Sequence, residues 1–236
     1  MKDHLARELA AVDWSDWDAA RLAVLELMEI YCGGASDAAA VISANFYTLA
    51  REYATGKVYD GAFVDSGRVP EATRQAVTDF FATDGATRES VTEKLIDRLG
   101  YETRRASGEC IMRNGQSDKL RPRYARVPSG SDTCPFCLML ASRGFVYHSA
   151  RLAGQLNHYH NNCDCRIVPG FDGFTEVEGY DPEACYDAWQ QSLDKTAEER
   201  AERDGTTVAE EKAAIMAGYR RSADSAHKRN GRSSTR

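Results

Sequence analysis

Five potential metal ligands lie in two short clusters of the chain. The first cluster is Cys134-Pro-Phe-Cys137, and the second is His160-Asn-Asn-Cys163-Asp-Cys165. Thiolate sulfur and imidazole nitrogen are the ligands that tetrahedral Zn²⁺ prefers, and a C-x-x-C turn presents two thiolates to one point. The sequence therefore predicts a structural zinc site that draws ligands from both clusters.

The second cluster offers three candidates for the two remaining positions. If Cys163-Asp-Cys165 is extended, both sulfurs point to the same side, because side chains alternate along a strand. We expect His160 and one of these two cysteines to complete the site, and we favour Cys165 as the ligand carried by a strand. The spacing alone leaves the choice between Cys163 and Cys165 open.

Other uses of the cysteines and of a metal fit the sequence less well. The chain begins without an apolar export segment, so we expect a reducing compartment, where paired cysteines bind metal more often than they form disulfides. A closed set of four ligands leaves no open position for a catalytic water, and neither the H-E-x-x-H pattern nor the zinc-deaminase pattern is present. Phosphate-loop, dinucleotide-binding and nucleophile-elbow motifs are also absent. We therefore expect a protein that is not an enzyme.

Composition is that of a globular protein with two basic segments. The 236 residues carry a net charge of −6, and no run of 18 apolar residues suggests a membrane span. Residues 101–126 hold seven basic groups against three acidic ones, and residues 220–236 hold six against one. The second segment lacks apolar anchors, so we expect a disordered tail that is either solvated or in contact with nucleic acid or an acidic protein surface.

The elements that must position the two clusters are mostly helical before residue 120. A capping box at Ser15 and Asp18 predicts a helix that ends at Gly33-Gly34, and a second helix follows from Ser36 or Asp37 to Gly56. We expect the second helix to pack into the core through residues at i, i+4, i+7 and i+11, namely Ile42, Phe46, Leu49 and Tyr53.

Two further helices are predicted in the same half. One begins near Pro70, and the other carries Val91, Leu95, Ile96 and Leu99 and ends at Gly100.

Short extended segments surround the clusters, at 124–128, 145–148 and 165–168, and a helix begins at Pro182. The prediction is an α+β fold: a mostly helical N-terminal half (1–120), a small zinc-pinned α+β module (121–175), a helical C-terminal segment (176–219) and a disordered basic tail (220–236).

Three stretches resemble one protein family. They are Ala125-Arg-Val-Pro-Ser-Gly130, Thr133-Cys-Pro-Phe-Cys-Leu-Met-Leu-Ala-Ser-Arg-Gly144 and Tyr159-His-Asn-Asn-Cys-Asp-Cys165. Together they are similar to the MuF-type minor head proteins of tailed phages, especially those of actinobacterial hosts and their prophages. The resemblance covers about residues 124–170, and its most specific part is the C-x-x-C…H-x-x-C-x-C frame.

The resemblance implies a minor capsid protein that acts in head morphogenesis and DNA packaging, beside the portal protein and the major capsid protein. It implies a virion location after synthesis in the host cytoplasm, and no catalysis. Carried over by position, the family's metal-ligating set is Cys134, Cys137, His160, Cys163 and Cys165. The alternative function is a zinc-stabilised DNA-binding module, which the basic segments favour.

Overall fold

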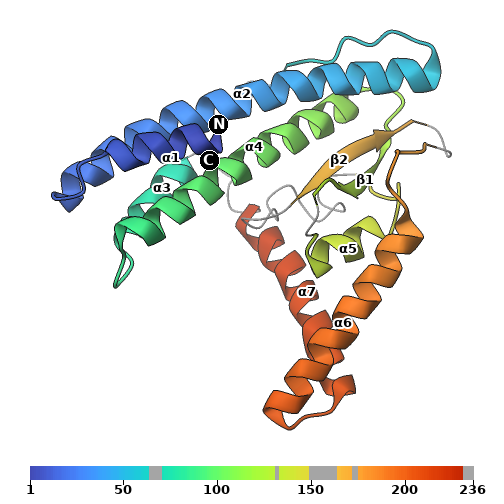
Figure 1. The fold of residues 1–236 in the computed structure, drawn as a ribbon. Coiled ribbons are helices and arrows are strands. Elements are labelled where there is room, and N and C mark those ends of the chain that lie inside the picture. Colours follow the sequence, from blue (N-terminus) through green and yellow to red (C-terminus); the bar gives the residue numbers. More distant parts are fainter. Residues whose placement is uncertain (64–70, 131–132, 149–163, 172–174, 231–236) are drawn as a thin grey trace. The chain divides into compact units, whose positions relative to one another are not determined.

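The computed structural model describes residues 1–63, 71–130, 133–148, 164–171 and 175–230. Within these residues the chain forms seven helices and a two-stranded sheet (Figure 1). This confirms the α+β class. The chain divides into two compact units, the first made of Met1–Tyr53 and Lys57–Asn114, and the second mainly of the described residues from Gly115 onward.

The first unit is built from α1 (Lys2–Ala11), α2 (Trp17–Thr55), α3 (Glu71–Phe81) and most of α4 (Arg88–Ser117). All four helices contribute apolar side chains to one core. Its buried members include Leu5, Leu9, Val24, Met28, Val77, Phe81, Val91, Leu95 and Leu99. Because every helix buries part of its surface here, this unit has the extended apolar core that a helical domain needs.

The beginning of α2 differs from the predicted capping box. The backbone amide of Ala19 donates to Asp16 Oδ1 over 3.0 Å, and the amide of Asp18 donates to the same oxygen over 3.1 Å. Asp16, not Ser15, therefore satisfies the amides at this helix start, and a carboxylate is favoured there by the positive end of the helix dipole.

The predicted break at Gly33-Gly34 is wrong, because α2 continues without interruption from Trp17 to Thr55. Glycine in a helix interior costs about 1 kcal/mol relative to alanine. The flanking residues Cys32, Ala35 and Ser36 are all buried, so packing on both sides of the glycines stabilises the helical conformation.

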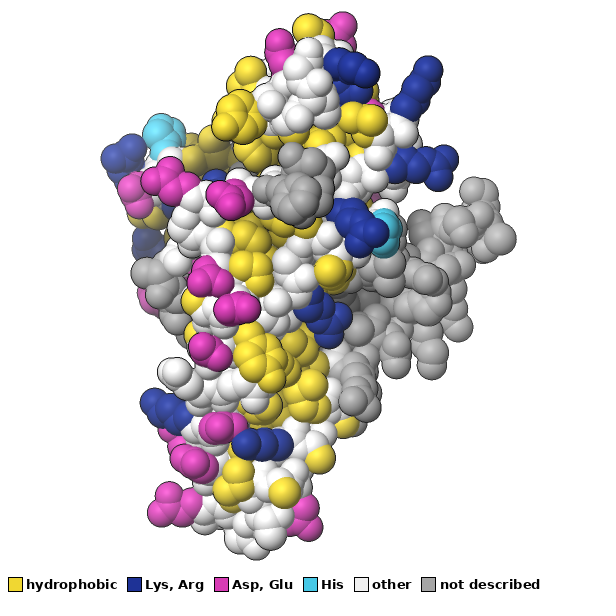
Figure 2. Space-filling model, turned by 90° about the vertical axis from the view of Figure 1, so that its right-hand side faces the viewer, with side chains coloured by type: hydrophobic (Ala, Val, Ile, Leu, Met, Phe, Trp, Pro, Cys, Tyr) yellow, Lys and Arg dark blue, Asp and Glu magenta, His cyan; other side chains and the backbone are white. Residues whose placement is uncertain are grey.

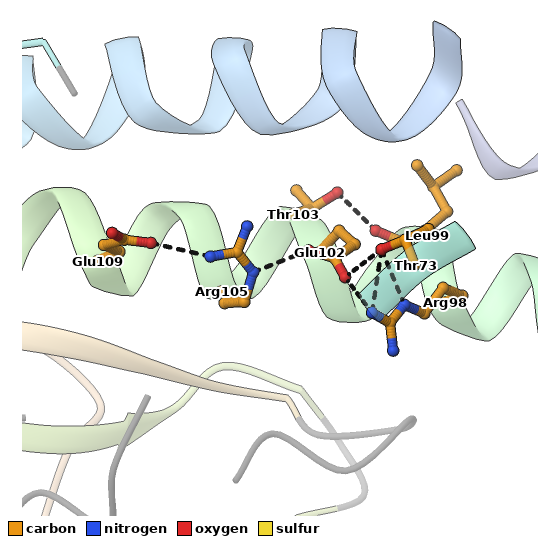
Figure 3. A network of polar contacts seen from close by, with 7 residues as sticks. All are labelled: Thr73, Arg98, Leu99, Glu102, Thr103, Arg105 and Glu109. Atoms are coloured by element: carbon orange, nitrogen blue, oxygen red, sulfur yellow. Dashed lines mark hydrogen bonds and ion pairs between the residues drawn. The ribbon is translucent and has the colours of Figure 1, made fainter. Parts of the chain in front are cut away.

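The predicted end at Gly100 is also wrong, since α4 extends to Ser117. A ladder of ion pairs lies along this helix, and Figure 3 shows its first four members, Arg98, Glu102, Arg105 and Glu109. Arg113 extends it by pairing with Glu109, and each member is three or four residues from the next. Side chains with this spacing are neighbours on a helix surface, so the ladder supports the helix across and beyond the glycine.

The centre of the ladder is a buried carboxylate. Glu102 is fully buried, and its oxygens lie 2.6 Å from Arg98 Nη2 and 2.8 Å from Arg105 Nε. The hydroxyl of Thr73 on α3 donates to Glu102 Oε1 over 2.7 Å. The opposite charges and the hydroxyl compensate the loss of water around Glu102, and they join α3 to α4.

The C-terminal part of α2 does not bury the predicted face. The exposed fractions of Ile42, Phe46, Leu49 and Tyr53 are 68%, 42%, 65% and 95%. We call these four residues the α2 seam. The expectation that they pack into the core is therefore wrong.

Small side chains on another face of α2 pack against α4 instead. Ala40 and Ala44 are buried against Cys110, and the hydroxyls of Ser43 and Ser107 lie 2.7 Å apart. Small residues allow two helices to approach closely, and α2 and α4 accordingly run side by side (Figure 1). The apolar periodicity of the large residues pointed to the wrong face.

The second unit contains the sheet, in which β1 (Arg123–Pro128) pairs antiparallel with β2 (Cys165–Gly170). These strands confirm the predicted extended segments at 124–128 and 165–168. The third predicted segment, 145–148, contributes a single bridge between Tyr147 and Tyr124. One face of the sheet buries Ala125, Val127 and Val168 beneath Phe145, Val177 and Tyr180.

Three helices complete the second unit: α5 (Pro135–Ala141), α6 (Pro182–Asp204) and α7 (Val208–Asn230). The predicted start at Pro182 is confirmed, and Asp181 caps it by accepting from the amide of Glu183 over 2.8 Å. Helix α7 includes residues 220–230, which we expected to begin a disordered tail, and residues 231–236 lie outside the described part of the chain. None of the helices in the described ranges is long and apolar enough to cross a membrane.

Candidate metal centre

The C-x-x-C cluster forms the start of α5. Cys134 is the N-cap residue, and its Sγ accepts a hydrogen bond from the backbone amide of Cys137 over 3.3 Å. Pro135 occupies the first helical turn, where its fixed φ favours the helical conformation. Cys137 is fully buried and Cys134 is partly exposed. The turn thus joins Cys134 to the backbone of Cys137 at the start of α5.

Cys165 is carried by the strand, as the sequence predicted. It is the first residue of β2, it is buried, and it pairs with Pro128 at the end of β1. Directly opposed residues of an antiparallel pair share a face, and side chains alternate along each strand. Cys165 therefore lies on the same face of the sheet as Arg126 and Ile167.

Arg126 connects this face to the C-x-x-C turn. Its guanidinium Nη2 lies 3.8 Å from Cys137 Sγ, and the whole side chain is buried. The strand register and this contact together place Cys137 and Cys165 on the same side of the sheet. Residues that are separated by most of the module in sequence are brought to one region.

A buried arginine has a chemical meaning at this position. Removing a guanidinium from water is costly unless negative charge lies nearby. A positive neighbour favours the thiolate form of cysteine, and the thiolate is the form that binds metal. Zn²⁺ bound by three thiolates and one neutral imidazole is anionic, so Arg126 fits the charge of such a centre.

Asp164 joins the segments that carry the two clusters. The amide of Gly130 donates to Asp164 Oδ2 over 3.2 Å, and the hydroxyl of Thr133 donates to the same oxygen over 2.6 Å. The hydroxyl of Ser129 donates to the backbone carbonyl of Asp164. These bonds fix the chain just before Cys134 against the residue just before Cys165.

The contact also requires glycine at position 130. A Cβ there would lie 2.8 Å from Asp164 Oδ2 and 2.9 Å from Asp164 Cβ. Sequence reasoning did not single out Asp164. Two features of the sequence could have pointed to this contact. Asp164 lies between Cys163 and Cys165, and Ser129-Gly130 forms a turn-prone pair shortly before the first cluster.

An aromatic pair covers the C-x-x-C turn from α7. The ring of Tyr219 lies 5.5 Å from that of Phe136, the residue before Cys137. Burial, and next the negative charge of Cys134, raise the pKa of Tyr219 above its ordinary value. Tyr219 on α7 therefore lies near Cys134 at the start of α5.

Two of the five predicted ligands, His160 and Cys163, lie outside the described residues. Across the ranges that are described, no group of three or more His, Cys, Asp or Glu side chains has the arrangement of a metal site. Of the predicted ligands, the described chain includes Cys134, Cys137 and Cys165, with Cys137 in contact with Arg126, and the ligand set stays a prediction. The donor chemistry of thiolates beside a buried cation fits zinc.

Comparisons with known proteins point to phages. The VG15 protein family matches residues 1–192. The Gene 15 protein of Mycobacterium phage D29 is 30% identical over 26% of this chain and 32% of its own length, and the Gene 15 protein of Mycobacterium phage L5 is 29% identical over 35% and 42%. The matched region thus spans less than half the length of these curated relatives. No solved structure matches the chain.

Proposed function

Since this chain belongs to the VG15 protein family and is similar to mycobacteriophage proteins, we propose that it is a structural minor head protein of a tailed phage or prophage. It acts in head morphogenesis near the portal, as a MuF-type protein would. Phage origin is the part of this function that the family supports directly. The role in the head and the partners are our proposal.

The α2 seam is the observation that carries the proposal. Four large apolar residues on one helix face are exposed, three of them by about two thirds or more. Figure 2 shows that hydrophobic side chains reach the surface among charged ones on one face of the molecule. Large exposed apolar patches mark interaction surfaces, because leaving them in water is costly. We assign the portal protein as the partner of the seam.

The second unit supplies a metal-stabilised module to this structural role. Cys134, Cys137, His160 and either Cys163 or Cys165 would hold Zn²⁺, with Cys165 favoured by its place on β2. A closed set of four protein ligands supplies folding energy and no catalytic water position. Such a centre would keep the small sheet folded while the head assembles and fills with DNA.

A DNA-binding module is the second candidate, and the ion-pair ladder weakens it. Arg105 and Arg113, two basic groups of the segment 101–126, are engaged with Glu102 and Glu109. The basic groups that favour DNA contact in this segment are therefore the exposed Lys119, Arg121 and Arg123. Measurable affinity of the purified protein for duplex DNA at about 150 mM salt, with no protein in capsids, would favour this candidate.

Two matched isoleucines test the proposal. Ile42 on the seam and Ile30 on the same helix are 68% and 69% exposed, and they lie roughly 120° apart around the helix axis. We expect Ile42→Asp to lower the number of copies per purified capsid by about tenfold, because a charge would be buried against the portal. Ile30→Asp should leave the copy number unchanged.

The capsids are to be purified from cells that express the portal gene and each variant at equal levels. Circular dichroism of both purified variants controls for folding. Equal copy numbers for the two variants would remove the seam from the portal contact.

A further inference from the structure

A cavity of about 450 Å³ lies in the second unit, apart from the cysteines. Its lining combines two arginines, Arg121 and Arg123, with two phenylalanines, Phe145 and Phe171, and the hydroxyl-bearing Thr175. The volume is within the usual range for sites that hold a small molecule. The head-assembly role described above makes no use of this cavity.

The two arginines are available to a ligand. Within the described part of the chain, neither Arg121 nor Arg123 has an ion-pair partner, in contrast to the arginines of α4. They are also the only charged side chains that line the cavity among the described residues. Among the described residues, an anion entering it would therefore meet two guanidinium groups and no carboxylate of the lining.

The backbone holds Arg121 in an unusual conformation. Its φ of 47° makes it the one non-glycine residue with positive φ among those described, and it precedes Pro122. A residue before proline normally adopts an extended conformation, so the left-handed one is disfavoured twice. Conformations of this kind cluster at ligand-binding positions, where the surrounding structure maintains them.

Asp118 maintains this conformation. Its Oδ1 accepts from the amide of Leu120 over 2.9 Å, and its carbonyl oxygen accepts from the amide of Arg121 over 3.1 Å. Asp118 is itself buried. The loop that presents Arg121 to the cavity is thus fixed before any ligand arrives, which lowers the entropic cost of binding.

We propose that this cavity binds a nucleoside monophosphate unit, with the phosphate at Arg121 and Arg123 and the base against the phenylalanine rings. Guanidinium groups bind phosphate oxygens in a bidentate manner, and aromatic rings stack on any of the bases. Gly170 shapes the same wall, since a Cβ there would lie 2.6 Å from Phe145 Cδ1. The unit is either one nucleotide of an exposed DNA strand or a free nucleotide.

The test measures binding of two probes to the purified full-length protein. Fluorescence anisotropy follows a labelled oligothymidylate, and isothermal titration calorimetry follows thymidine monophosphate. We expect R121Q/R123Q to weaken binding by about tenfold or more, since two charge-assisted contacts are removed. The matched control R166Q removes a positive charge from an exposed residue of β2 that does not line the cavity, and it should change affinity by less than about threefold.

The two probes distinguish the sources of the ligand. Binding of both probes supports a free nucleotide, and binding of the oligonucleotide alone supports a strand of DNA, provided that R121Q/R123Q weakens it and R166Q does not. No binding of either probe overturns the proposal. Equal weakening by R166Q also overturns it, because the contact would then be general attraction to the protein's charge.

A second variant separates ligand binding from folding. Arg121→Gly removes the guanidinium and also relieves the disfavoured φ, so we expect the thermal midpoint to stay equal or rise while affinity falls. A lower midpoint with unchanged affinity would assign Arg121 a structural role and overturn the proposal. None of these measurements depends on capsids, so failure here leaves the head-protein role standing.

Discussion

The two compact units of this chain differ in the size of their apolar clusters. The first draws buried apolar residues from four helices into one core and adds a buried ion-pair ladder along α4. In the described part of the second unit the buried apolar residues form smaller, separate clusters: Ala125, Val127 and Val168 on one face of the sheet, and Leu193, Ala197 and Ile215 between α6 and α7. A sheet of only two strands is marginal in water without further support. We therefore propose that the sheet of the second unit relies on a metal centre for part of its stability, whereas the first unit relies on its apolar core.

The largest expected effect comes from removing a metal ligand. Cys134→Ser, or a strong zinc chelator, should unfold the two-stranded sheet and α5, because a structural zinc site contributes on the order of 10 kcal/mol to folding. Hydrogen exchange read by mass spectrometry should show loss of protection in β1, α5 and β2 and none in α1–α4. Cys185→Ser, at a partly exposed cysteine on α6, is the control and should behave as the wild type.

Equal protection of β1 and β2 in Cys134→Ser and Cys185→Ser would contradict the metal-dependent account of the second unit. The metal content of the purified protein, measured by inductively coupled plasma mass spectrometry, should be about one zinc per chain if four ligands close one site.

A smaller effect is expected in the first unit on changing Glu102. Glu102→Gln leaves Arg98 and Arg105 with less negative charge in a buried position, which should cost about 3–5 kcal/mol. Thermal unfolding followed by circular dichroism measures this loss. The exposed pair of Glu29 and Arg74 provides the control, and Glu29→Gln should cost less than about 1 kcal/mol.

Comparable losses for Glu102→Gln and Glu29→Gln would mean that the ladder is not an important source of stability for α4. Such a result would mean that the first unit does not gain the stability that we attribute to its buried ion pairs.

Asp164 should show a smaller effect still. Asp164→Asn keeps the shape of the side chain but loses charge-assisted acceptance from Gly130 and Thr133, at a cost of about 1–3 kcal/mol. We expect weaker zinc affinity and faster hydrogen exchange in residues 129–134, measured by competition with a chelating dye and by mass spectrometry. The exposed Asp204→Asn, at the end of α6, is the control.

Unchanged zinc affinity in Asp164→Asn would show that the two cysteine clusters come together without this link. The metal alone would then account for the arrangement of the module.

The smallest expected effect on stability is that of the seam. Ile42→Asp should change the free energy of unfolding by no more than about 0.5 kcal/mol, because the side chain is exposed in the isolated protein. Chemical denaturation measures it. A loss of several kcal/mol would show that the seam is part of the first unit's own packing.

The sequence allowed the local elements to be predicted where turn chemistry and strand composition agreed. The β1 and β2 strands follow from Tyr124 and Val127 and from Ile167 and Val168, all good strand formers, and α6 follows from Asp181-Pro182. The prediction of a helix end at Gly33-Gly34 was wrong because burial of the neighbouring helical turns outweighs the free-energy cost of glycine in a helix. That burial depends on tertiary packing, which the local sequence does not reveal.

Tertiary relations were harder to predict. The apolar spacing of the α2 seam is that of a core face, and only the small residues Ala40, Ser43 and Ala44 on another face signalled where α4 packs. The cysteine clusters could be identified from residue type and spacing. The contacts of Arg126 and Asp164 depend on the register of β1 against β2, which the sequences of two short strands do not determine. The metal itself stays a prediction for the experiments above.

The most direct test of the proposed function is quantitative mass spectrometry of gradient-purified phage heads made with and without this gene, beside its portal gene. The account predicts a few copies of the protein in each head, and heads that assemble abnormally or in lower yield when the gene is removed. Complete absence of the protein from heads of an otherwise intact phage would contradict it.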